Sequence, residues 1–293
     1  MKQDNTTNSG RKRKSMDMLR SNRPAIDNCN ICGKVAKLTE DHVPPKFWNN
    51  EEHKKYSQGL GAFDPEYAKA QFPWNAPNGL VYRSICSDCN NRILGDETDK
   101  PLKEFCDAIK KNLQFRHKYF NCRIKPNCVA RAVVGHMLAA KDFYDSECII
   151  DQKLREYVLN PTALPPSDMQ LLYFLYPYGY TVIGRDIVVG QCVPRLAGAR
   201  VPEGTLSCIY AYPVGLLLVE RGADLHLKDM FTYCSDAFDE EKEVLCKLDS
   251  LYYYGTNVLR DPFWPMNISD QADGISFLLG GASMRSLRIG VEK

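Results

Sequence analysis

Apolar residues recur at three- and four-residue spacing in one stretch of the chain, as they do on the buried face of an amphipathic helix. These positions are Leu102, Phe105, Ile109 and Leu113. We expect a helix to begin near Asn90, to pass the Leu94-Gly95 step and to resume from about Thr98. A further helix is marked by similarly spaced apolar residues, which are Val129, Val133, Met137 and Ala140.

From residue 169 onward, short runs of branched and aromatic residues are bounded by Gly and Pro, which is typical of β-strands. The runs cover residues 171–176, 180–184, 186–190, 206–212 and 216–220. Helices combined with this strand-rich part predict an α+β fold. Residues 48–77 instead show no clear periodicity and carry several Gly and Pro, so we expect a long loop there.

The length and composition fit one small and one larger globular domain. The 293 residues are 44% hydrophobic and 25% charged, which provides enough apolar material for a sizeable core. Residues 1–26 indicate a disordered basic tail, because they are rich in Asn, Ser, Lys and Arg. We expect a polar, cysteine-marked domain over residues 27–125. A larger α+β domain over residues 126–293 would serve recognition, regulation or partner docking.

Twelve cysteines are a high count, and four of them form two C-x2-C pairs: Cys29 with Cys32, and Cys86 with Cys89. Four thiolates in two such pairs can close a tetrahedral zinc site that holds a small fold together, so we predict a structural zinc ion. The other eight cysteines are scattered singly and the first residues are polar. This favours free thiols in a cytoplasmic protein over a secreted disulfide framework. No apolar run approaches the roughly 18 residues needed to span a bilayer.

A candidate catalytic set lies between and just after the two cysteine pairs. It consists of Asp41 and His42, followed by Asn90 directly after Cys89. Phosphodiester hydrolysis needs an activated water and charge neutralisation at the scissile phosphate. A histidine with a pKa near neutrality can be the base, and carboxylate and amide oxygens suit a hard cation such as Mg2+. Because neighbours on a strand point to opposite faces, Asp41 and His42 could cooperate only if the strand end is twisted or bent.

The string Leu-Thr-Glu-Asp-His-Val-Pro-Pro-Lys at residues 38–46, set between two C-x2-C pairs with Asn after the second, resembles the HNH endonucleases. Within that family it is most similar to the zinc-stapled branch with a ββα-metal fold. The resemblance covers residues 29–99, about a quarter of the chain. It implies roles for four residues: His42 is the general base, Asp41 and Asn90 bind a catalytic Mg2+ or Mn2+ ion, and Asn78 orients the base. Asn91 is the alternative to Asn78 or Asn90 in these roles.

Basic residues near this set predict contact with a phosphate backbone. Residues 100–125 carry eight Lys and Arg against two acidic residues, whereas the net charge of the whole chain is only +2. The predicted contacts are Lys46, Arg92, Lys103, Lys110 and Lys111. The expected activity is hydrolysis of double-stranded DNA. By analogy with the family, it would serve bacterial or phage-related defence.

Two other functions stay open at this point. A zinc-dependent nucleic-acid-binding or adaptor module without nuclease activity explains the cysteine pairs and the basic residues, but gives Asp41 and His42 no purpose. A protein-interaction scaffold would use residues 126–293 to bind a protein partner or a second copy of the chain. The isolated histidines are expected to be solvated or structural, and they are His53, His136 and His226.

Overall fold

The structure is a computed structural model, and it describes residues 23–50, 54–58, 74–114, 119–141, 143–176, 179, 181–189, 204–222, 227–247 and 274–278. Most of the predicted basic tail, residues 1–22, lies outside these ranges, and so do His53 and His226. No helix among the described residues combines the length and apolar character needed to cross a membrane.

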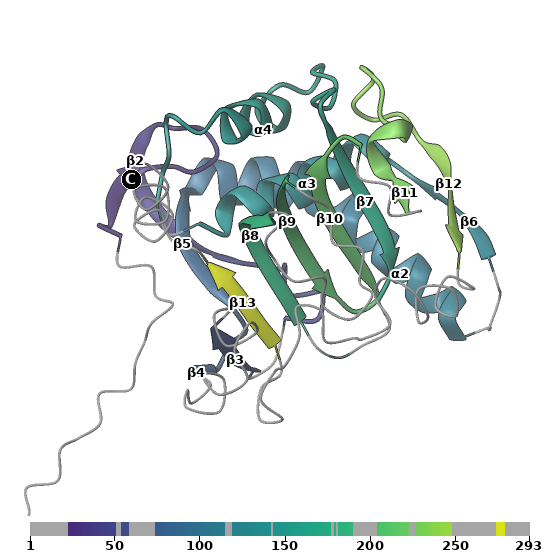
Figure 1. The fold of residues 1–293 in the computed structure, drawn as a ribbon, viewed down its shortest axis with the longest axis horizontal. Helices are drawn as coiled ribbons and strands as arrows, with labels where there is room; N and C mark the ends of the chain where they lie inside the picture. The colour runs from purple at the N-terminus through teal and green to yellow at the C-terminus, as the bar shows by residue number, and fades with distance from the viewer. Residues whose placement is uncertain are drawn as a thin grey trace, which may run out of the picture.

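Eight strands form a mixed sheet in the order β11-β7-β10-β9-β8-β13-β3-β4 (Figure 1). Its centre is antiparallel and consists of β7 (Met169–Leu175), β10 (Val214–Glu220), β9 (Gly204–Ala211) and β8 (Thr181–Val189). Strand β13 (Gly274–Leu278) lies parallel to both β8 and β3. The other strands are short: β11 (Lys228–Asp229), β3 (Lys54–Gln58) and β4 (Trp74–Ala76).

The strands predicted from branched and aromatic runs are confirmed in the centre of this sheet, with two differences. The runs at residues 180–184 and 186–190 form one strand, β8, whose register with β9 shifts around Asp186, a residue with a positive φ of 51°. Residues 48–77 were predicted to be a loop, but they contribute β3 and β4. The prediction was wrong at these two strands, while residues 51–53 and 59–73 lie outside the described ranges. Strand β3 pairs with β4 and also with β13, whose residues lie near the other end of the chain.

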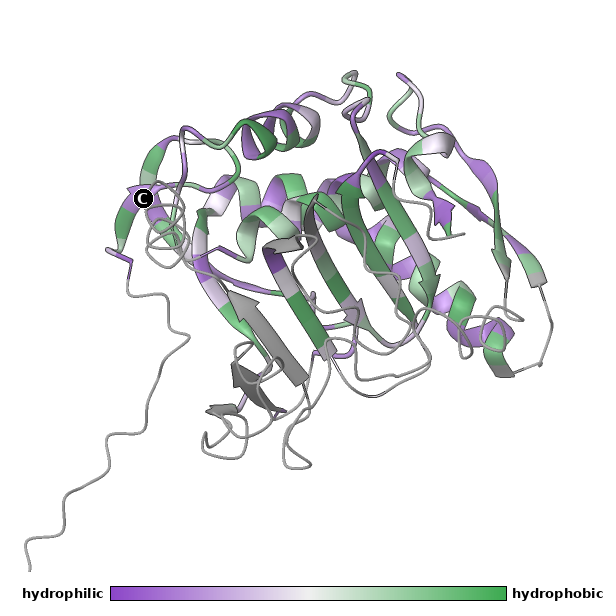
Figure 2. Cartoon of the chain, in the orientation of Figure 1, coloured by the Kyte–Doolittle hydropathy of each residue, from purple (hydrophilic) through white to green (hydrophobic). Residues whose placement is uncertain are grey.

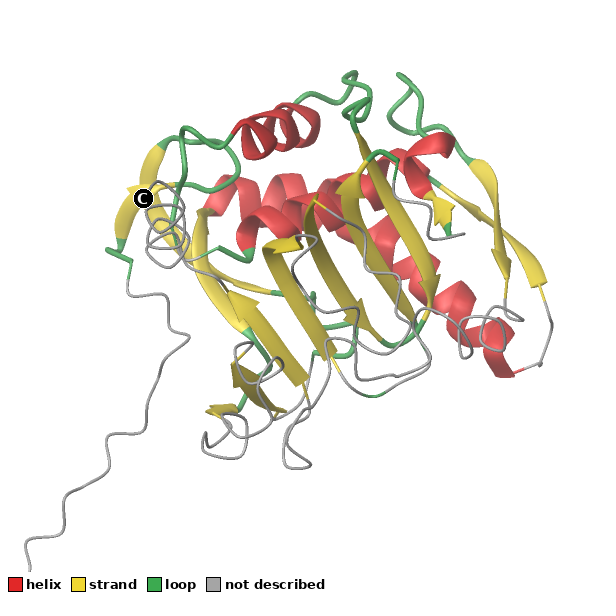
Figure 3. Cartoon of the chain, in the orientation of Figure 1, coloured by secondary structure: helices red, strands yellow, loops and turns green. Residues whose placement is uncertain are grey.

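Helices α2 (Lys100–Gln114) and α3 (Pro126–Ala139) lie behind the large sheet, and α4 (Ile149–Leu159) lies beside α3 (Figure 3). Phe105 of α2 contacts Tyr173 of β7 edge to face, with ring centroids 6.2 Å apart. Every residue of α3 is buried, because α2, α4 and a short helix η4 (Met230–Tyr233) pack around it. Figure 2 shows the hydrophobic residues concentrated on the central strands, where a buried helix is expected to pack.

A second, antiparallel sheet has the order β1-β2-β5 and consists of β1 (Ile26–Asn28), β2 (Val35–His42) and β5 (Val81–Cys86). Helix η2 (Asp88–Asp99), which has π-type hydrogen bonding, follows β5, and α2 continues from it. The predicted helix near Asn90 is therefore confirmed, and so is its continuation beyond Thr98. A third sheet pairs β6 (Tyr119–Ile124) with β12 (Lys242–Lys247).

Buried side chains on both sides of residue 125 belong to one hydrophobic core. Leu94 of η2 packs directly on Gly135 of α3, where an added Cβ would lie 2.5 Å from the Leu94 Cδ2 atom. Residues on the two sides of the predicted boundary at residue 125 therefore pack against one another. The described residues as a whole have the predicted mixture of helices and sheets, so the α+β class is confirmed.

Candidate metal centre and adjoining polar site

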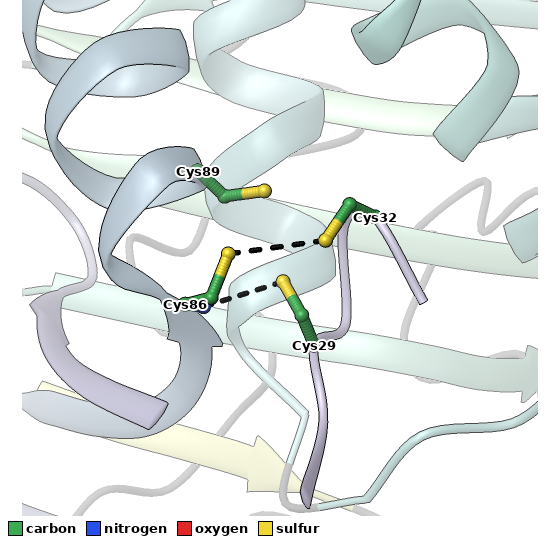
Figure 4. A group of neighbouring side chains, drawn as sticks. All are labelled: Cys29, Cys32, Cys86 and Cys89. Atoms are coloured by element: carbon green, nitrogen blue, oxygen red, sulfur yellow. Dashed lines mark hydrogen bonds between the residues drawn. The ribbon is translucent and has the colours of Figure 1, made fainter. Parts of the chain in front are cut away.

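The two cysteine pairs meet in space although 53 residues lie between them. Cys29 and Cys32 lie in the turn between β1 and β2, while Cys86 and Cys89 lie where β5 meets η2 (Figure 4). All four Sγ atoms lie within 4.8 Å of one another. The Sγ atoms of Cys32 and Cys86 are 3.8 Å apart, close to the distance expected between two sulfurs on one zinc ion with Zn–S bonds of about 2.3 Å. This group could hold a metal such as zinc.

The ionisation of these thiols also favours a bound cation. A hydrogen bond from Cys89, acting against burial, lowers the pKa of Cys29 to about 5. Burial raises the pKa of Cys32 to about 11, and the bond with Cys29, followed by burial, raises the pKa of Cys89. Once Cys29 is ionised, each further thiolate adds like charge to a buried space. A divalent cation would allow all four to be thiolates together.

The cysteines outside this group are free thiols in the part of the chain that the structure describes. Burial raises the pKa of Cys106 and of Cys208 to about 12. Thiols with such pKa values stay protonated and react slowly. They pack as small hydrophobic residues, as the scattered spacing predicts.

Asn30, between Cys29 and Cys32, anchors the first cysteine pair to the helices. Its Nδ2 donates to the carbonyl oxygens of Leu138, at 3.2 Å, and Lys141, at 2.9 Å, at the end of α3. Its own carbonyl accepts a hydrogen bond from Arg155 Nε of α4 at 2.9 Å. The candidate metal centre is therefore fixed to α3 and α4 as well as to the small sheet.

Asp41 points into the protein, where His136 of α3 holds its carboxylate. His136 Nδ1 lies 3.0 Å from Asp41 Oδ2, and His136 Nε2 lies 2.8 Å from Asp99 Oδ1. Burial lowers the pKa of His136, but Asp99 and Asp41 outweigh burial and raise this pKa to about 10. His136 is thus a buried cation between two carboxylates, and we name this group the Asp41–His136–Asp99 bridge. The sequence predicted a structural role for His136, but no local pattern linked it to Asp41, 95 residues earlier.

His42 follows Asp41 at the end of β2, and its Nε2 lies 3.1 Å from the carbonyl oxygen of Asn78. A carbonyl oxygen only accepts hydrogen bonds, so Nε2 carries a proton. In the neutral ring, Nδ1 then keeps the lone pair that a base needs. Burial, followed by the positive charge of Lys46, lowers the pKa of His42 and so favours its neutral form near pH 7.

Asn50, which sequence reasoning missed, ties the loop of Asn78 to the segment after His42. Its Oδ1 accepts from the backbone N–H of Leu80 at 2.8 Å. Its Nδ2 donates to the carbonyl oxygens of Pro44, at 2.6 Å, and Leu80, at 3.1 Å. Asn50 is fully buried, so these bonds stabilise the loop without competition from water. A single Asn in a stretch without periodicity carries no sequence signal for such a role.

Asn90 lies in the first turn of η2, beside β2. Its Nδ2 donates to Thr39 Oγ1 at 3.1 Å and to the Glu40 carbonyl at 3.0 Å, which leaves Oδ1 as the amide atom suited to a cation. Asn91 is exposed and donates to Ser87 Oγ at 2.9 Å. The structure therefore brings Asn90 close to the strand of Asp41 and His42, and it places Asn91 at the surface.

Three of the five predicted phosphate contacts meet carboxylates of neighbouring residues: Arg92 with Asp88 and Glu97, and Lys103 and Lys110 with Asp107. Arg92 and Lys103 are exposed and Lys110 is half-buried. Ion pairs near the surface are individually weak, so these reduce the positive charge offered to a phosphate without removing it. Lys46 and Lys111 are exposed as well. Lys46 also lies close enough to His42 for its positive charge to lower the pKa of His42.

Comparisons of the chain with models of protein families, with curated proteins and with solved structures found no match. The class of this protein is therefore described from its fold and its cysteine group. The chain is an α+β protein with four close cysteines that could bind a metal such as zinc.

Proposed function

We propose that this chain is a metal-dependent endonuclease of the HNH type that hydrolyses phosphodiester bonds in DNA. The observation that carries the proposal is the hydrogen bond from His42 Nε2 to the Asn78 carbonyl, because it leaves Nδ1 as the basic nitrogen. The paired strands β2 and β5, followed by η2, also support the proposal. The four cysteines connect the start of β2 to the point where β5 meets η2, and so hold in place the strand that carries His42. Zinc at the cysteines would be purely structural.

In this function, His42 Nδ1 removes a proton from the attacking water while the Asn78 carbonyl keeps the ring oriented. Asp41 and Asn90 would hold Mg2+ or Mn2+ through oxygen atoms, the ligands that these hard cations prefer. When bound, the cation neutralises charge at the scissile phosphate. Lys46 would contact the phosphate backbone next to His42. Partner binding or oligomer formation through residues 126–293, a cytoplasmic location and a defence role stay predictions.

A second candidate function is a zinc-dependent nucleic-acid-binding or adaptor module without nuclease activity. It is favoured because the two candidate metal ligands, Asp41 and Asn90, form hydrogen bonds with other groups of the protein. The Asp41 carboxylate bonds to His136, and the Asn90 amide bonds to Thr39 and Glu40. These contacts give both residues a structural role that needs no cation.

Cleavage of plasmid DNA with added Mg2+ or Mn2+ separates the two functions. We expect the wild-type chain to cut, and His42→Ala to lose at least about 100-fold in rate, the usual contribution of a general base. The matched control is Lys37→Ala, an exposed residue of the same strand, which should cut normally. Both variants should keep the wild-type zinc content. Full cutting by His42→Ala would refute the assignment, while DNA binding without cutting by the wild type would favour the adaptor module.

A further inference from the structure

The Asp41–His136–Asp99 bridge is a buried charged group whose presence the base chemistry of His42 does not explain. We propose that His136 is a positioning residue for the catalytic cation site. It holds Oδ2 of Asp41, so that Oδ1 is the carboxylate oxygen presented to the cation. This inference rests on the proposed function, because it assigns a cation to Asp41.

The geometry of the bridge fixes the orientation of the imidazole ring. His136 bonds to Asp41 of β2 through Nδ1 and to Asp99 of η2 through Nε2, at 3.0 Å and 2.8 Å. The ring cannot rotate without losing one of these bonds. His136 itself is 1% exposed and belongs to α3, which is buried along its length. Hydrogen bonds that hold a ligating carboxylate from behind are a common way to orient metal ligands.

The burial of Asp41 makes its orientation depend on this contact. Asp41 is 6% exposed, so water is a poor alternative partner for its carboxylate. With Oδ2 held by His136, Oδ1 is the oxygen left for a cation.

A second buried ion network lies apart from the bridge. It joins the end of α3 to α4 and β8, and it contains no residue of β2 or η2. Its members are Lys141, Arg155 and Arg185 with Asp151 and Asp186. None of the predicted catalytic residues belongs to this network. This network provides a control for the effect of disturbing buried ion pairs.

The test is Mn2+ binding to the zinc-loaded full-length chain, measured by isothermal titration calorimetry. We expect His136→Gln to weaken Mn2+ binding at least tenfold, the size usual for loss of a residue that orients a ligand. Asp99→Asn should weaken it less, because the ring keeps its bond to Asp41. The control Lys141→Gln makes the same exchange of a buried cation for an amide in the other network. It should lower the melting temperature and leave Mn2+ affinity unchanged.

The outcomes separate this proposal from the proposed function. Unchanged Mn2+ affinity in folded His136→Gln overturns the positioning role, and so does an equal loss in Lys141→Gln. If His136→Gln does not fold, Asp99→Asn decides by the same criterion. If the wild type has no Mn2+ site that Asp41→Asn removes, the cation site itself fails and the positioning role fails with it. Zinc content equal to that of the wild type is required of every variant compared.

Discussion

Gly79 lies where the loop of Asn78 passes the buried side chain of Asn50, and we predict that Gly79→Ala is strongly destabilising. Gly79 has a positive φ of 81°. An added Cβ would lie 2.3 Å from the Asn50 carbonyl oxygen and 2.5 Å from Asn50 Oδ1. The first of these atoms is backbone, so it cannot move aside as the end of a long side chain would.

Two energetic costs set the expected loss of stability in Gly79→Ala. A residue with a Cβ in the left-handed region costs about 1–2 kcal/mol. Displacing Asn50 also strains its bonds to Leu80 and Pro44 in a fully buried position, which adds about 1–3 kcal/mol for a group left unsatisfied. The total is about 2–5 kcal/mol, and at roughly 2–4 °C per kcal/mol the melting temperature should fall by roughly 4–20 °C.

The matched control is Gly222→Ala. Gly222 has a positive φ of 109°, and no atom of the described residues lies within 4 Å of its added Cβ, so among these residues the variant meets backbone strain alone. Thermal and urea unfolding, followed by circular dichroism, should show the larger loss for Gly79→Ala. Equal losses in the two variants would refute the argument that the close approach to Asn50 decides the cost. Because His42 contacts the Asn78 carbonyl, Gly79→Ala should also lower DNA cleavage in any molecules that remain folded.

Two further predictions concern the metal centre and the core. Cys86→Ser should lose bound zinc and melt at a lower temperature, because it removes one of four ligands. The control is Cys208→Ser, at a buried cysteine far from the group in sequence, which should keep its zinc. A normal zinc content of Cys86→Ser by elemental analysis would contradict the site. Trp48→Phe removes the Nε1 bonds to the carbonyl oxygens of Ala211, at 3.0 Å, and Val214, at 3.2 Å. This should cost about 1–3 kcal/mol in urea unfolding, so wild-type stability would count against the role of these bonds.

Local sequence patterns were enough to predict the elements whose residues follow a short-range pattern. Helix α2 follows from four apolar residues at helical spacing, and the central strands follow from branched and aromatic runs. The four-cysteine group follows from two short motifs, since metal chemistry brings such pairs together regardless of the chain between them. Strands β3 and β13 had no such signal, because each is short and they pair with each other from distant parts of the chain.

The sequence by itself determined the α+β class, the cysteine group and the position of Asp41 and His42 at the end of one strand. Only the tertiary structure decided which partners these side chains meet. His136 reaches Asp41 because α3 is buried between η2 and α4, and Asn78 reaches His42 because Asn50 holds its loop. Contacts of this kind join residues that are far apart in sequence and share no periodicity. They arise from packing, which local patterns do not encode.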